Sequence, residues 1–227
     1  IETTLLTPEA LGEVIIPWGT TTLCVDAMEI ANVACIDGLL AMIKDSEKLP
    51  FRLLLEIPSR VPTAPGLETT GGVLGVEEVT QLLELDEAVS LGELDPSKVL
   101  GMKEEYLEKV LASLNRRKIC NGHAIGLGVD DLNIYAAGHL SDDHESVYYE
   151  ELLERLRLGI MPLIREGSSE RNVDTLVPGI VNNNLPTDNM MFCTDDKHVN
   201  DIFKEGHISY NVKRSIELGL DPVQAIQ

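Results

Sequence analysis

The chain has 227 residues, of which 44% are apolar and 25% are charged, a balance typical of soluble globular proteins. Acidic residues outnumber basic ones by 38 to 18, and the net charge of −20 argues against nucleic acid and anionic membrane surfaces as partners. There is no signal peptide and no run of 18 apolar residues, and none of the four cysteines forms a close pair. We therefore expect a cytoplasmic protein with reduced thiols and no membrane span.

Short β-rich apolar segments alternate with longer amphipathic segments along the whole chain. The seven predicted strands are residues 20–26, 51–57, 88–91, 118–122, 140–144, 160–165 and 190–194. The predicted helices are residues 30–43, 76–85, 103–114, 129–137, 148–158, 173–181, 211–218 and 222–227. This alternation implies parallel strands joined by crossover helices. A doubly wound sheet and an eightfold β/α barrel both fit seven strands, and the lack of a G-x-G-x-x-G motif after the first strand favours the barrel.

Side chains that can bind metal ions fall where four of these strands end. They are Glu93, His123, His144 and the Asp195-Asp196 pair. Each has a structural explanation by itself: a loop carboxylate, a hydrogen-bonded histidine or a helix N-cap. In a β/α barrel, however, all strand ends meet at one mouth, where active sites are built. Two histidines with two or three carboxylates there predict a site for zinc, iron or manganese.

A further polar segment, Arg165-Glu166-Gly167-Ser168, follows the sixth predicted strand. Its arginine and glutamate could hydrogen-bond a flat polar ring, or they could pair with each other across the barrel mouth. The sequence leaves these two alternatives open.

At these positions the sequence resembles bacterial adenine deaminases of the amidohydrolase superfamily. The segments FCTDDKH at 192–198 and EGHI at 205–208 resemble the last barrel-strand motif of that family. Segments similar to its earlier strand motifs occur in the family's order: GTTT at 19–22, EIANV at 29–33, LGE at 91–93, GHA at 122–124, DHE at 143–145 and IREGS at 164–168. The resemblance covers essentially the whole chain.

The resemblance implies an α/β fold, a (β/α)8 TIM-type barrel, and a centre of two divalent ions of manganese, iron or zinc. By its motifs, Glu93 bridges the ions, His123 and His144 hold one of them, and Asp195 binds the other and shuttles protons. The family's first strand carries a His-x-His pattern that would lie before Ile1. We therefore expect residues 1–227 to form an incomplete catalytic barrel that lacks this first strand and any C-terminal remainder.

The activity implied is hydrolytic deamination of adenine, a small purine, to hypoxanthine and ammonia, as in purine salvage. Asp195 and Glu145 are the expected catalytic residues, and the expected substrate contacts are Asp26, Arg165, Glu166 and Ser168. A homo-oligomer is also expected. Met28 stands where the family has a histidine. Such departures leave open another amidohydrolase reaction, on an aminated heterocycle or a cyclic amide. The missing first strand leaves open a second alternative, an inactive fragment.

Overall fold

The computed structural model describes residues 6–69 and 71–227, and its framework is a sheet of seven parallel strands. In chain order the strands are β1 (Thr22–Asp26), β2 (Arg52–Ile57), β3 (Ala88–Leu94), β4 (Ile119–Gly122), β5 (Asp142–Asp143), β6 (Met161–Arg165) and β7 (Met191–Cys193). Each strand pairs in parallel with the next one along the chain. The seven predicted strands are thus all present.

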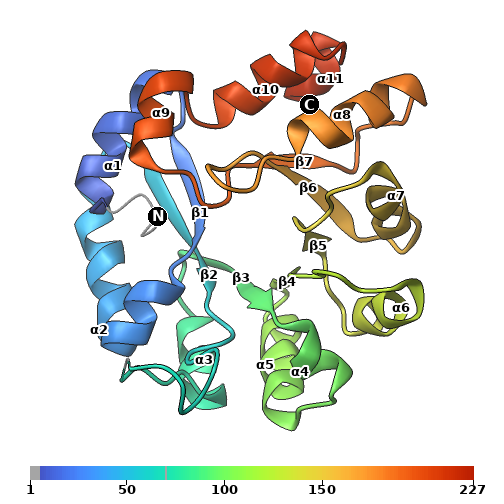
Figure 1. Ribbon diagram of the computed structural model, residues 1–227. Helices are drawn as coiled ribbons and strands as arrows, with labels where there is room; N and C mark the ends of the chain where they lie inside the picture. The colour runs from blue at the N-terminus through green and yellow to red at the C-terminus, as the bar shows by residue number, and fades with distance from the viewer. Residues whose placement is uncertain (1–5, 70) are drawn as a thin grey trace.

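The helices surround this sheet on its outer side, while the strands curve round a central axis (Figure 1). They are α1 (Pro8–Ile15), α2 (Met28–Ser46), α3 (Val76–Leu82), α4 (Pro96–Leu100), α5 (Glu104–Asn115), α6 (Val129–Ala137), α7 (Tyr149–Arg157), α8 (Val173–Asn182), α9 (Val199–Glu205), α10 (Ile208–Glu217) and α11 (Pro222–Ile226), with a short 3-10 helix η2 (Ile16–Trp18). None of the helices in residues 6–69 and 71–227 is long and apolar enough to span a membrane.

The strand order separates the two architectures that the sequence left open. A doubly wound sheet reverses direction part-way, so that neighbours in the sheet are distant in sequence. Here the order runs from β1 to β7 without a reversal, as in a β/α barrel. Within the described residues no pairing joins β7 to β1, so the sheet is a curled, open one. Residues 6–69 and 71–227 therefore form seven strands of a barrel-like sheet and not a closed eightfold barrel.

The main core lies between the sheet and the helices around its first half. Strand residues such as Leu55 and Leu91 pack there against helix residues such as Leu39 and Val79, and all four are fully buried. Burying one such side chain stabilises the fold by roughly 1.5–3 kcal/mol. A second cluster around Ile164 packs β6 against α7, α8 and α10. These two clusters hold the strands whose ends carry the polar residues.

Two predicted strands differ in length from those in the structure, and three short helices were not predicted. The strand predicted to end at Leu91 continues to Leu94, because the backbone N–H of Glu93 donates to Asp26 and Leu94 pairs with Gly122. The fifth strand is shorter than predicted and consists of Asp142–Asp143. Helices α1, α4 and α9 were not predicted; they have only five to eight residues, too few for a clear apolar period.

Candidate metal centre

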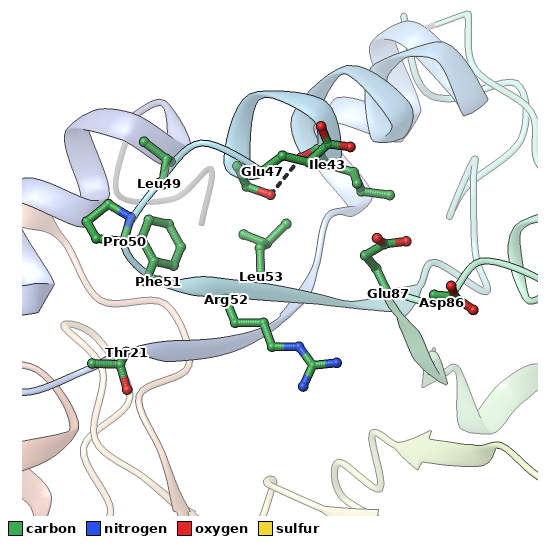
Figure 2. Close-up of a pocket in the computed structure, with 11 residues that line it drawn as sticks. Thr21, Ile43, Glu47, Leu49, Pro50, Phe51, Arg52, Leu53, Asp86 and Glu87 are labelled. Carbon is green, nitrogen blue, oxygen red and sulfur yellow. Dashed lines mark hydrogen bonds between the residues drawn. The ribbon is translucent and has the colours of Figure 1, made fainter.

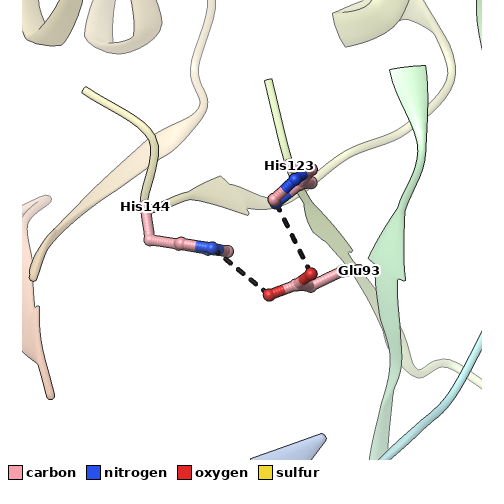
Figure 3. Close-up of side chains that lie close together, drawn as sticks. All are labelled: Glu93, His123 and His144. Carbon is pink, nitrogen blue, oxygen red and sulfur yellow. Dashed lines mark ion pairs between the residues drawn. The ribbon is translucent and has the colours of Figure 1, made fainter. Parts of the chain in front are cut away.

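Glu93, His123 and His144 meet at the carboxyl ends of β3, β4 and β5 (Figure 3). One possible ligand atom from each lies within 4.8 Å of those of the other two. Nε2 of His144 is 3.2 Å from Oε1 of Glu93, and Nδ1 of His123 is 3.4 Å from Oε2 of the same carboxylate. In the part of the chain that is described, this is the one group of three potential ligands. These three side chains converge in the structure, as the sequence predicted.

The donor atoms of this group fit a divalent ion. Nδ1 of His123 is buried and has no hydrogen-bond partner, although carboxylate oxygens of Glu93 and Glu145 lie within 3.4 Å. A buried polar atom without a partner is costly, and coordination of a cation removes that cost. Two imidazole nitrogens with a carboxylate are ligands that zinc, iron and manganese accept.

The surrounding carboxylates make the interior of the sheet strongly acidic. Burial, and then the charges of Asp142 and Glu93, raises the pKa of Glu56 to about 7. Burial likewise raises the pKa of Asp142 to about 6 and that of Asp26 well above its usual value. Negative charges crowded together in this way are stabilised by a bound cation. The electrostatics therefore agree with the donor set.

His144 and Glu145 are coupled to each other. Burial lowers the pKa of His144, but the carboxylates of Glu145 and Glu93 outweigh burial and hold that pKa well above its usual value. For Glu145, burial raises the pKa, whereas His144 and the charge of Arg165 outweigh burial and lower it to about 2. Glu145 is therefore an ionised acceptor beside both histidines.

Arg165, at the end of β6, links this cluster to Asp195. Its Nη1 lies 2.9 Å from Oε1 of Glu145 and 3.1 Å from Oδ2 of Asp195, and its Nε donates to Asn172. Asp195 follows β7, and its backbone has the left-handed φ of 50°. Asp195 is not in the group of three ligands; it is joined to them through Arg165 and Glu145.

The remaining predicted site residues occupy different surroundings. Glu166 accepts from the backbone N–H of Val173 at the start of α8, and Ser168 donates to Asp201 on α9. Asp26, at the end of β1, accepts from the backbone N–H of Glu93 through one oxygen, while its other oxygen is buried without a partner. Arg165 and Glu166 do not pair with each other; Glu166 pairs with Arg171.

Sequence reasoning missed Arg60 and Glu56. Arg60 follows β2 and forms an ion pair and a hydrogen bond with Glu93. Glu56 is next to last in β2, beside Asp26 in the neighbouring strand. The signal for both was available, because they stand at or just after the end of a predicted strand. Neither residue is a histidine or part of one of the family-like motifs, so the sequence analysis did not select them as site residues.

A surface hollow of about 450 Å³ lies at the other end of the strands (Figure 2). Its lining includes Thr21, Arg52 and Glu87, which precede or open β1, β2 and β3. Glu93, one of the metal-binding candidates, lies near the opposite end of β3. This hollow is therefore separate from the candidate centre.

Comparison with known proteins places the chain among relatives. No protein-family model matches it. It is 63% identical over 227 residues to an adenine deaminase of Desulforamulus reducens, and 44% identical over 228 residues to one of Desulfitobacterium hafniense. Over its whole length the chain is similar to adenine deaminases. It spans 39% and 40% of these two proteins, about two fifths of their length, and all of its own. The resemblance seen in the sequence motifs is thereby confirmed.

One solved structure supports the fold. The structure of a TatD homologue from Escherichia coli matches 97% of this chain and 85% of its own, with a TM-score of 0.58. The sequence identity is 13%, so the likeness concerns the fold alone. It agrees with a barrel-like α/β architecture for this chain.

Proposed function

We propose that the protein is a metal-dependent adenine deaminase that hydrolyses adenine to hypoxanthine and ammonia. The observation that carries this proposal is the meeting of Glu93, His123 and His144 at three neighbouring strand ends, in a chain 63% identical to an adenine deaminase. In this reaction the ring carbon bearing the amino group gains the oxygen of water and loses ammonia.

Glu93, His123 and His144 would hold a divalent ion of manganese, iron or zinc. When bound, such an ion lowers the pKa of a coordinated water, so that hydroxide is present near neutral pH. We further propose a second ion, for which Glu93 serves as a shared ligand and Asp195 as another. Arg60 orients Glu93 through their ion pair.

Asp195 is proposed to move the protons. Its carboxylate, held by Arg165 and by the backbone N–H of Asp196, takes a proton from the attacking water and passes it to the departing amino group. Glu145 is the candidate that acts at the ring nitrogen. Because its carboxylate is ionised, it would accept a hydrogen bond from a ring N–H, and it would have to take up a proton before it could protonate a ring nitrogen. Its contacts with both histidines and with Arg165 support this proposal.

Asp26, Arg165, Glu166 and Ser168 remain proposed substrate contacts, with different support. Asp26 has a buried oxygen free to accept an N–H from a purine. Arg165 contributes by orienting Glu145 and Asp195. Glu166 and Ser168 already have partners on α8 and α9, so they would act by shaping the loop after β6.

The test is turnover by the intact protein after removal of metal and reloading with manganese. We expect adenine to be converted to hypoxanthine with one ammonia per molecule, and the activity to disappear with a chelator and return with manganese. Other aminated heterocycles and cyclic amides serve as comparison substrates. A clear preference for a cyclic amide would favour another amidohydrolase reaction, and no turnover with stoichiometric metal would favour an inactive protein.

A further inference from the structure

A buried ion pair outside the proposed ligand set links the loops that carry the two histidines. Nε of Arg155, on α7, lies 2.6 Å from Oδ2 of Asp143. The same oxygen accepts from the backbone N–H of Glu145, and Oδ1 accepts from the backbone N–H of Ala124 at 2.6 Å. Nη2 of Arg155 donates to the backbone carbonyl of Ala124 at 2.8 Å, and Nη1 donates to that of Glu151. Asp143 and Arg155 thus hydrogen-bond the backbone N–H and the backbone C=O of the same residue, Ala124.

The residues joined by these hydrogen bonds are sequence neighbours of the two candidate ligands, His123 and His144. Ala124 follows His123 directly, and Asp143 and Glu145 enclose His144. Asp143, Arg155 and Ala124 are all buried, so water does not compete for these hydrogen bonds. A shift of either loop would therefore break bonds inside the pair.

The strand ladder between these loops is too short to hold them by itself. β5 has two residues, and its pairing with β4 joins Asn121 to Asp142. β4 ends at Gly122 and β5 at Asp143, directly before His123 and His144. Beyond the last strand pairing, the Arg155–Asp143 ion pair and its hydrogen bonds to Ala124 connect the two loops.

Stability alone does not account for an ion pair at this place. Removing two charges from water is costly, and apolar residues of similar volume often stabilise a fold equally well. Such a pair offers instead a fixed geometry, since the guanidinium fork and the carboxylate accept few arrangements.

We propose that Arg155, through its ion pair with Asp143, is a positioning residue that sets the separation of His123 and His144 for one divalent ion. This inference rests on the metal centre of the proposed function, but not on adenine as the substrate. Arg155 touches neither the ion nor the substrate; it acts through Asp143 and Ala124.

The test is the affinity for manganese alone, measured by titration calorimetry on the intact, metal-free protein. Arg155→Met is expected to weaken manganese binding by about 10- to 100-fold, as for other groups that orient metal ligands. Arg155→Lys keeps the charge but cannot reach both partners, so its loss should be smaller. Arg157→Met is the matched control, because Arg157 is exposed on the same helix and should leave the affinity unchanged.

Thermal unfolding of each metal-free variant shows whether it is folded at the temperature of the titration. If Arg155→Met does not fold, Asp143→Asn, which keeps the acceptor for Ala124 and loses the charge, takes its place. The double variant should bind manganese no more weakly than Arg155→Met, because the two residues act as one unit. A folded Arg155→Met or Asp143→Asn variant with the wild-type affinity would overturn the inference and leave the proposed function intact. A wild-type protein that binds no manganese would overturn both.

Discussion

Asp195→Asn is expected to slow adenine deamination by about 10²- to 10⁴-fold while the protein stays folded. The amide that replaces the carboxylate can neither take a proton from water nor return one to the leaving amino group. The fold should tolerate the change, because asparagine adopts the left-handed conformation of residue 195 at least as readily as aspartate does. The amide oxygen can also still accept from the N–H of Asp196.

The measurement is kcat at saturating adenine, together with the manganese content of the purified variant. Asp196→Asn is the matched control, because Asp196 is the next residue in the chain and is exposed. It should keep most of the activity. Near-normal turnover of Asp195→Asn with normal metal content would remove the proton-shuttle role from Asp195, and a large loss in Asp196→Asn would transfer that role to its neighbour.

Glu93→Gln is expected to weaken manganese binding by at least about 100-fold and to reduce turnover accordingly. Altering a group that only orients a ligand already costs about 10- to 100-fold, so removing a ligand charge should cost no less. The change also leaves Arg60 without the carboxylate it pairs with, which places an uncompensated positive charge beside the centre. That charge repels the ion further.

Manganese affinity of Glu93→Gln is measured by calorimetry, with Glu87→Gln as the control. Glu87 immediately precedes the same strand at its other end, so the control makes the same chemical change away from the centre. We expect Glu87→Gln to bind manganese as the wild type does. A Glu93→Gln protein that binds manganese with the wild-type affinity would exclude Glu93 as a ligand.

The meeting of Glu93, His123 and His144 could be predicted from the sequence, although Glu93 and His144 are 51 positions apart (144 − 93). Apolar segments of strand length are visible without tertiary information, and parallel strands place all of their carboxyl ends on one edge. A residue that directly follows such a strand can therefore be assigned to that edge of the sheet from the sequence. The same reasoning placed Asp195 at this edge, but could not show that Arg165 and Glu145 stand between it and the histidines.

Side-chain partners on helices were beyond prediction. Arg155 lies in an amphipathic helix among other charged residues, and its sequence position does not distinguish it from the exposed Arg157. Which of the two turns inward depends on how α7 packs against the sheet. Arg60 is a different case, because its place just after a predicted strand was visible in the sequence, whereas its pairing with Glu93 depends on the tertiary structure.

The short strands and helices were the second feature that the sequence did not predict well. β5 is two residues long, and its position depends on pairing with β4 and β6 rather than on its own composition, which is acidic. Helix α1 has a Thr7 N-cap and Pro8 at its first position, a start signal that the sequence does contain. Its few apolar positions did not suffice to extend that signal into a predicted helix.

The central claim is that Glu93, His123 and His144 bind a divalent ion, and a crystal structure of the intact protein loaded with manganese tests it most directly. Anomalous scattering locates the ion independently of any assumption about the ligands. The account predicts a strong peak within coordination distance of a Glu93 oxygen and of one ring nitrogen of each histidine. Stoichiometric manganese in solution, with its anomalous peak away from these three side chains, would contradict the account.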